Sequence, residues 1–224
     1  ESRTNYIDNS NNLSLWNRPI NSPVFDANTT ETVSPDGTNN STKITGGTNS
    51  GASRDSILTV SASTTYTASF FAKKGSTDNL RIEFGTGGNQ FSANFNLTTK
   101  AFSSTSANGW FASVSASYVD YPNGWVRLIL SGTTSGSASG NANFAIYGIS
   151  SGYVYLWGAQ AEVGSFPTSI IPTSGSTVTR SPDIATIEGN KFAKTNLLEY
   201  SERFDNAAYA KQNGTPVTPN QVAA

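Results

Sequence analysis

The chain has 224 residues, a net charge of −1 and only 13% charged residues, and its length suits one large all-β domain or two small domains. It contains no Cys and no His, which excludes disulfides, thiolate nucleophiles, Cys/His zinc sites and histidine bases. The near-zero charge offers no electrostatic footprint for nucleic acid, and no segment approaches the roughly 18 apolar residues of a membrane span, so we expect no nucleic-acid partner and no membrane insertion.

Two short segments of the chain resemble each other. Residues 3–10 and 194–201 each begin with a basic residue, Thr and Asn, continue with two apolar residues, and end in Ser. This pattern predicts an internal repeat, with one full unit over residues 1–193 and the opening of a second, similar unit over 194–224. The alternative is chance similarity between two Asn-rich loops.

The order of the predicted elements follows from composition and alternation. Residues 17–55 are rich in Asn, Thr, Ser, Gly and Pro, so we expect a loop-rich region with a short strand near its end. From residue 66 onward, apolar and polar side chains alternate with a period of two. The Pro-containing residues 164–187 are expected to form a C-terminal clasp. The predicted strands cover residues 41–45, 56–61, 66–73, 79–84, 91–97, 100–105, 110–119, 125–131, 143–149, 153–163 and 184–187, and a linker follows over 189–193.

The segment Tyr153–Val163 is the strand around which this prediction is organised. Its alternation gives two faces, one of which begins with two large aromatic residues and continues with alanine. We expect this aromatic face to point into the core, where Trp157 would pack against the earlier strands. The aromatic face comprises Tyr155, Trp157, Ala159, Ala161 and Val163.

Many short antiparallel strands with two alternating faces predict an all-β, two-sheet antiparallel sandwich. The length and the number of strands favour a jelly roll over a smaller immunoglobulin-type sandwich. The predicted core contains Phe70, Leu80, Ile82, Phe84, Phe91, Phe95, Val126, Leu128, Leu130, Phe144, Ile146 and Trp157.

Several segments together carry a family resemblance. They resemble the jelly-roll modules of phage tail-fibre and other virion surface proteins, which are themselves similar to carbohydrate-binding modules of the laminin-G and concanavalin type. The segment Thr195–Asp205 looks like the start of such a module, in agreement with the predicted repeat. The resemblance implies a location on the virion surface and a role in adhesion or virion structure, but it names no glycan, because a fold does not fix a function. The segments are Phe70-Phe-Ala-Lys-Lys-Gly75, Asn123-Gly-Trp-Val-Arg127, Tyr155-Leu-Trp-Gly-Ala-Gln160, Ser165-Phe-Pro-Thr-Ser-Ile-Ile-Pro172 and Val178-Thr-Arg180.

A polar patch is predicted where residues 79–84 and 91–97 form a hairpin. On each strand, alternation places the polar residues on the face opposite the core. A guanidinium, a carboxylate and amides suit the directional hydrogen bonds of sugar hydroxyls. The alternative is a solvated outer face with a surface ion pair that contributes about 0–1 kcal/mol. The patch comprises Arg81, Glu83, Ser92, Asn94 and Asn96.

Four aromatic residues near Asn, Gly or Pro are candidates for stacking on sugar rings, because loop residues often contact ligands. The alternative for each is that it anchors a loop to the sandwich. Trp125 and Trp157 lie in apolar strands, so we expect them to be buried instead. The four glycan-binding candidates are Trp16, Trp110, Tyr121 and Tyr153.

No constellation of catalytic residues is visible. A glycosidase needs two acids across a cleft, roughly 5–9 Å apart, and nothing in the sequence places Glu83 and Glu162 in this way. The acidic residues show no spacing typical of a calcium loop. We therefore predict no catalytic residues, no metal site and no cofactor.

These observations favour a non-enzymatic module of a phage virion fibre or other surface appendage, repeated in tandem. Its partners would be other virion proteins or copies of itself, and it could bind host-surface polysaccharide. One alternative is a carbohydrate-binding module attached to a glycan-degrading enzyme. A second alternative, a hydrolase acting by itself, is disfavoured because no acid pair is visible.

Overall fold

The structure is a computed structural model, and it describes residues 2–182. These residues form fourteen strands and two short 3₁₀ segments. Within the described residues, no helix has the length and apolar character needed to cross a membrane. The predicted strand over 184–187, the linker over 189–193 and the opening of a second unit over 194–224 lie outside the described residues, so they stay predictions.

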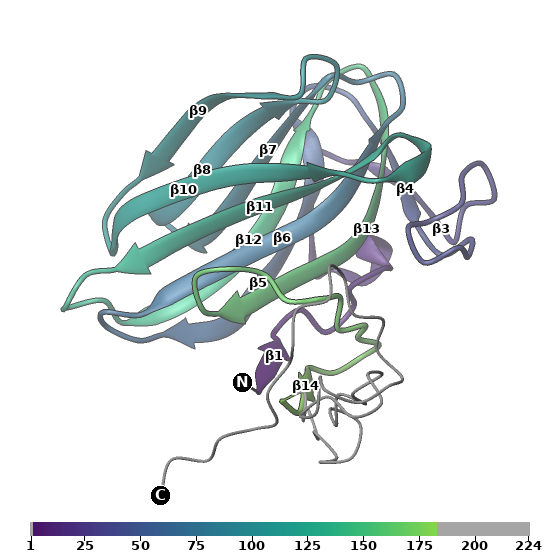
Figure 1. The fold of residues 1–224 in the computed structure, drawn as a ribbon. Coiled ribbons are helices and arrows are strands. Elements are labelled where there is room, and N and C mark those ends of the chain that lie inside the picture. Colours follow the sequence, from purple (N-terminus) through teal and green to yellow (C-terminus); the bar gives the residue numbers. More distant parts are fainter. Residues whose placement is uncertain (1, 183–224) are drawn as a thin grey trace, which may run out of the picture. The chain divides into compact units, whose positions relative to one another are not determined.

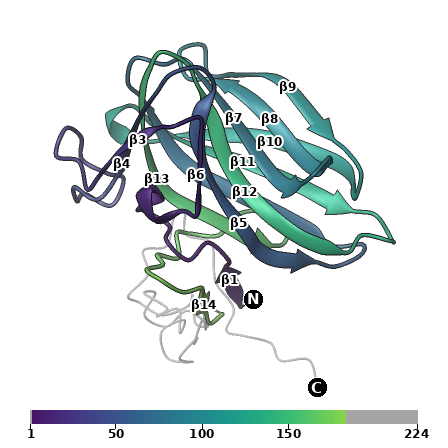
Figure 2. The ribbon, with the colours of Figure 1, turned by 180° about the vertical axis from the view of Figure 1, so that it is seen from behind.

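Two six-stranded antiparallel sheets make up most of the fold, and Figures 1 and 2 show them as two layers. We name each sheet after one of its inner strands. The β6 sheet has the order β10-β11-β6-β13-β4-β3, with β10 (Phe111–Asp120), β11 (Trp125–Thr134), β6 (Thr65–Lys74), β13 (Gly152–Val163), β4 (Thr42–Gly46) and β3 (Val24–Ala27). The β7 sheet has the order β2-β5-β12-β7-β8-β9, with β2 (Arg18–Ile20), β5 (Ser50–Val60), β12 (Gly140–Ile149), β7 (Asn79–Thr86), β8 (Asn89–Asn96) and β9 (Ala101–Ala107).

The path of the chain through these sheets confirms the predicted jelly-roll sandwich. From β4 to β7 the chain changes sheet at every step, and it does so again from β11 to β13. As a result β13 lies between β4 and β6, while β12 lies between β5 and β7. Such an exchange of strands between two packed antiparallel sheets is the jelly-roll arrangement.

One large hydrophobic core lies between the two sheets. It contains every predicted core residue except Trp157. Aromatic rings make up one part of it, where Phe91 stacks on Phe84 with 5.1 Å between ring centroids and meets Phe111 edge-on at 4.9 Å. Burying a side chain of this size contributes about 1.5–3 kcal/mol, so a core of this extent stabilises the fold without a disulfide.

The predicted orientation of β13 was wrong for Tyr155 and Trp157 and is confirmed for Ala159 and Ala161. Val154 and Leu156 point into the main core, whereas Tyr155 and Trp157 lie in a second cluster with Phe71 and Trp125. The register against β6 shifts between Trp157 and Gln160, which marks a β-bulge. A bulge inserts one extra residue and thereby reverses which side chains face inward, so Ala159 and Ala161 rejoin the main core.

The second cluster lies on the outer face of the β6 sheet and is covered by the loop of residues 28–41 between β3 and β4. The indole of Trp125 donates a hydrogen bond to the Val33 carbonyl at 2.9 Å, and the indole of Trp157 donates one to Asn40 Oδ1 at 2.6 Å. Both tryptophans are buried, as predicted. Their indole N–H groups explain why this polar loop is held against an apolar cluster.

A small third sheet joins the two ends of the described chain. The strand β1 (Arg3–Asn5) pairs with β14 (Val178–Arg180). Asn5 is fully buried, and its amide nitrogen donates to the carbonyls of Ala159 and Ile171, while Oδ1 accepts from the amides of Ile7 and Ala161. Asn5 therefore ties the first strand, β13 and the returning segment together.

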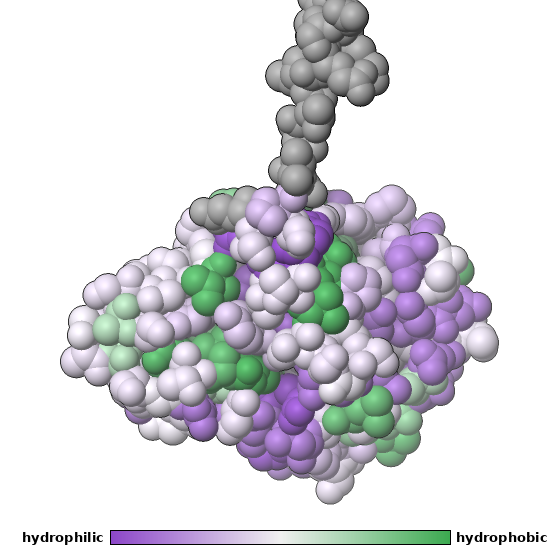
Figure 3. All heavy atoms as spheres, turned by 90° about the horizontal axis from the view of Figure 1, so that it is seen from below, coloured by the Kyte–Doolittle hydropathy of each residue, from purple (hydrophilic) through white to green (hydrophobic). Residues whose placement is uncertain are grey.

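Seen from the end where β1 and β14 lie, weakly polar and hydrophilic surface separates the apolar patches (Figure 3).

We expect Asn5→Leu to lower the free energy of unfolding by about 3–4 kcal/mol, because four buried hydrogen bonds are lost at about 1 kcal/mol each. Denaturant unfolding of the full chain measures this. The exposed Asn39→Leu is the matched control and should change the value by less than about 0.5 kcal/mol. Equal effects of the two substitutions would contradict the role assigned to Asn5.

We expect Gly158→Ala to destabilise the fold by at least about 1–2 kcal/mol, because Gly158 has a φ of +63° and left-handed backbone is unfavourable for alanine. A Cβ there would also lie 3.1 Å from Phe71 Cδ2 and 3.2 Å from Ile170 Cδ1. Thermal unfolding provides the measurement. Gly136→Ala, at an open position, is the control, and an unchanged melting temperature for Gly158→Ala would refute the argument.

Candidate functional site

The polar patch predicted on the outer face of the β7 sheet is present. In the β7–β8 hairpin Arg81 lies opposite Asn94, Glu83 opposite Ser92, and Asn79 opposite Asn96. The residues between them on β7 and β8 point into the main core. Because neighbouring side chains of a strand point to opposite faces, the five predicted residues share the outer face.

A hydrogen-bond network holds Arg81 in place. Its Nε donates to the Tyr147 hydroxyl at 2.6 Å, and its Nη2 donates to Ser92 Oγ at 2.9 Å. Tyr147 in turn donates to Glu83 Oε2 at 2.7 Å, and the same oxygen lies 3.4 Å from Arg81 Nη2. The guanidinium is therefore fixed from two neighbouring strands, β8 and β12, before any ligand arrives.

Tyr147 belongs to this network although it was not among the predicted site residues. It lies on β12 directly opposite Arg81 of β7. Burial, together with the hydrogen bond to Glu83 and the negative charge of Glu83, raises the pKa of Tyr147 to about 12. The phenol consequently stays protonated at neutral pH and acts as a hydrogen-bond donor to the carboxylate.

A pocket of about 390 Å³ opens beside Arg81. Amide, hydroxyl and guanidinium groups form most of its lining, together with Leu80, whose side chain points into the core, and a glycine. Such groups donate and accept hydrogen bonds in fixed directions, which suits the hydroxyls of a sugar better than an apolar ligand. The lining residues are Asn49, Asn79, Leu80, Arg81, Asn94, Ser103 and Gly148.

The other members of the predicted patch have supporting positions. Ser92 is buried beneath Arg81. Glu83 orients Arg81 and Tyr147 but does not line the pocket. Asn96 accepts hydrogen bonds from the amides of Thr98 and Thr99, so it closes the turn after β8. Only Arg81 and Asn94 of the five line the pocket.

The four aromatic candidates do not line this pocket. Trp16 is buried, packs on Phe144 with 5.7 Å between ring centroids and donates to the Asn9 carbonyl, so the prediction of a sugar platform was wrong for it. Trp110 is half-buried against the main core. Tyr121 and Tyr153 contact the second cluster on the outer face of the β6 sheet, where Tyr121 is 38% exposed.

The two glutamates considered for catalysis lie on different sheets. Glu83 faces outward on β7, and Glu162 is fully buried on β13, where Thr168 and Gln160 donate to its carboxylate. They do not face each other across one cleft. Among residues 2–182, no group of three or more His, Cys, Asp or Glu side chains could hold a metal ion.

Neither the protein-family models nor the curated proteins contain a match to this sequence.

The raised pKa of Tyr147 predicts a pH dependence of stability. Below pH 10 the phenol is protonated in both the folded and the unfolded chain, so the network contributes fully. Between about pH 10 and pH 12 the unfolded chain ionises first, and this contribution is lost. We therefore expect the stability advantage of the wild type over Tyr147→Phe to shrink across that range, measured by denaturant unfolding.

A spectrophotometric titration of the phenols is the direct companion measurement. Tyr147→Phe should lack a tyrosine ionisation near pH 12 that the wild type shows. Tyr118→Phe, which removes an exposed tyrosine, should retain it. A wild-type step at pH 10 that disappears in Tyr147→Phe would contradict the network.

Proposed function

We propose that this chain is a non-enzymatic adhesion module that binds a glycan in the pocket beside Arg81. The observation that carries the proposal is that pocket of about 390 Å³, whose rim combines a fixed guanidinium with the amides of Asn79 and Asn94. A ligand that binds there finds its donors already oriented, which reduces the entropy cost of association. The β-sandwich provides the rigid support on which such a site depends.

Among the described residues, no Asp or Glu lines the pocket beside Arg81, which supports binding rather than hydrolysis. Glu83, which contacts the pocket residue Arg81, already accepts hydrogen bonds from Arg81 and Tyr147. General acid catalysis would need a carboxyl group free to protonate a leaving group, with a second acid opposite. The buried Glu162 lies on the opposite sheet.

The resemblance to phage tail-fibre and virion surface modules supports a location on the virion. In that setting the module would extend an appendage through contacts with other virion proteins or with copies of itself. The outer face of the β7 sheet, where the pocket beside Arg81 opens, would bind host-surface polysaccharide. The Ser-, Thr- and Asn-rich surface with few charges suits a role outside the cell, where solubility depends on small polar side chains.

We expect Arg81→Gln and Asn94→Ala to weaken glycan binding by roughly tenfold or more, because each removes hydrogen-bond donors from the pocket. A glycan array identifies the ligand, and calorimetry with the best hit measures the affinity. Arg18→Gln is the matched control, since Arg18 also pairs with a carboxylate, Asp55, but lies on β2, away from the pocket.

Two outcomes would contradict this proposal. If Arg18→Gln weakened binding as much as Arg81→Gln did, the pocket would not be the site. If the wild type cleaved the bound polysaccharide and Glu83→Gln did not, the module would be an enzyme.

A further inference from the structure

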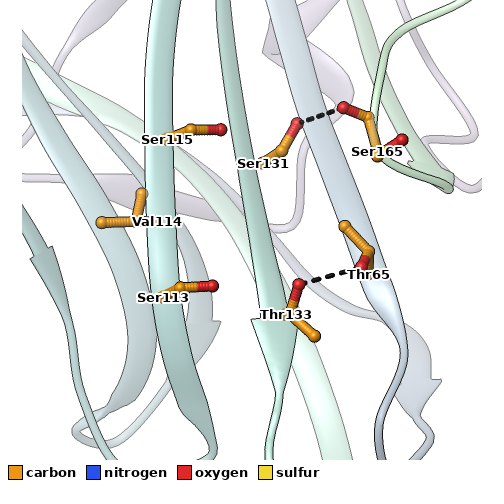
Figure 4. A pocket seen from close by; sticks show the side chains of 7 residues that line it. All are labelled: Thr65, Ser113, Val114, Ser115, Ser131, Thr133 and Ser165. Atoms are coloured by element: carbon orange, nitrogen blue, oxygen red, sulfur yellow. Dashed lines mark hydrogen bonds between the residues drawn. The ribbon is translucent and has the colours of Figure 1, made fainter.

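A second groove lies on the opposite side of the molecule, on the outer face of the β6 sheet. It has a volume of about 240 Å³, and every residue that lines it except Val114 is a serine or threonine. Figure 4 shows that the hydroxyls of Ser113 and Ser115 on β10 point toward β11, while Val114 points away. On β11, Thr133 bonds to the Thr65 hydroxyl at 2.9 Å, and Ser131 donates to the Ser165 carbonyl at 3.2 Å.

The same face of β11 continues from this groove to Arg127. Arg127, Ile129, Ser131 and Thr133 are two residues apart, so their side chains share the outer face. The distance from Ser131 to Arg127 is roughly 13 Å along the strand. This span is long enough for an oligosaccharide rather than a single sugar.

Arg127 is a buried cation with few partners. Only 7% of the residue is exposed, and its Nη2 donates to Ser69 Oγ at 3.0 Å. The guanidinium carbon lies 5.4 Å from the centroid of the Phe71 ring. Its Nε is buried and has no hydrogen-bond partner. Burying an N–H donor of a guanidinium without a hydrogen-bond partner is unfavourable.

The charge of Arg127 is not compensated by a carboxylate. Arg18, Arg54 and Arg81 each form an ion pair. Within residues 2–182, no carboxylate lies within ion-pair distance of Arg127. Burial lowers the pKa of its guanidinium, whereas the Tyr121 phenol, which also bonds to it, and the charge of Glu162 act in the opposite direction. A desolvated guanidinium attracts an anion strongly, because little hydration must be removed when the anion binds.

We propose that this face of the β6 sheet is a second ligand site, separate from the pocket beside Arg81, and that it takes an acidic polysaccharide. A uronate carboxylate would bind Arg127, and the hydroxyls of neighbouring sugars would bind the groove of Ser113, Ser115 and Thr133. The planar guanidinium suits a carboxylate, since two of its N–H groups can bind both oxygens. This inference does not depend on the proposed function of the first pocket.

The pattern of charge selects the class of ligand. The groove itself contains no charged side chain, and Arg127 lies beyond it on the same face of β11. A uronate-containing polysaccharide carries neutral hydroxyls beside each carboxylate, which matches a cation beside a row of hydroxyl side chains.

Tyr121 lies beside Arg127 and interacts with its guanidinium. Of the residues around the guanidinium, Ser69 and Phe71 are buried, whereas Tyr121 is 38% exposed and meets the Phe71 ring edge-on at 4.8 Å. A ring at this position can stack on a sugar while the carboxylate reaches the cation. Tyr121 was a candidate in the sequence, and this placement assigns it to the second site.

The test uses the full chain with polygalacturonate as the acidic polymer and dextran as the neutral one, by affinity electrophoresis and calorimetry. We expect binding to polygalacturonate and a loss of roughly tenfold or more in Arg127→Gln, because the charge-assisted hydrogen bonds disappear. Ser115→Tyr should give a similar loss by filling the groove. Ser115 is exposed, so this variant should fold even if Arg127→Gln does not.

Ser137→Tyr, at an exposed turn outside the groove, is the matched control and should bind like the wild type. The proposal fails if the wild type does not bind polygalacturonate, if it binds dextran equally well, or if Ser115→Tyr binds like the wild type. It also fails if Arg81→Gln alone abolishes binding, since the polymer would then occupy the first pocket. Preference for a phosphate-containing polymer over polygalacturonate would overturn the assignment of a uronate.

Discussion

The register of β13 against β6 shifts between Trp157 and Gln160, and Gly158 between them has a φ of +63°. Without this bulge, strict alternation would keep Trp157, Ala159 and Ala161 on one face. The bulge instead lets two large aromatic rings point outward while the alanines that follow point inward. The thin, alanine-lined part of the core and the aromatic cluster outside the sheet are two consequences of one inserted residue.

This aromatic cluster occupies part of the outer face of the β6 sheet and leaves another part of that face free for a ligand. On the β6 sheet, the loop of residues 28–41 and Ile170 cover the cluster, so the hydroxyl-lined strip of β10 and β11 remains open. On the β7 sheet, the outer face carries polar residues, and the pocket beside Arg81 opens onto it. The two proposed sites therefore lie on opposite layers of the sandwich.

Alternation alone was sufficient to predict the β7–β8 hairpin, because polar and apolar residues change places at every step on both strands and a glycine-rich turn joins them. The same rule gave the wrong orientation for Tyr155 and Trp157 of β13. The bulge there depends on the pairing with β6 and produces no repeating pattern in the sequence. Trp16 appeared in a polar sequence, but Phe144 of a distant strand buries it. The alternation along β12 indicates that Tyr147 faces outward. Its partners Arg81 and Glu83 lie on β7, and the pairing of β12 with β7 cannot be derived from the local sequence pattern. The strands β2 and β3 were missed for a similar reason, because their short polar sequences form strands through pairing with β5 and β4.

The two arginines show why burial and pairing must be considered together. Arg81 is partly exposed and has a carboxylate, a phenol and a hydroxyl around it, so its position is fixed at low electrostatic cost. Arg127 is more deeply buried, yet its partners are a serine, the Phe71 ring and the Tyr121 phenol rather than a carboxylate, and one of its donors has no partner. An ion pair that is complete within the protein orients a binding site but adds little attraction for a charged ligand. Arg127 forms no ion pair, so its charge remains available to a ligand. We therefore assign neutral sugar hydroxyls to the first site and an acidic sugar to the second.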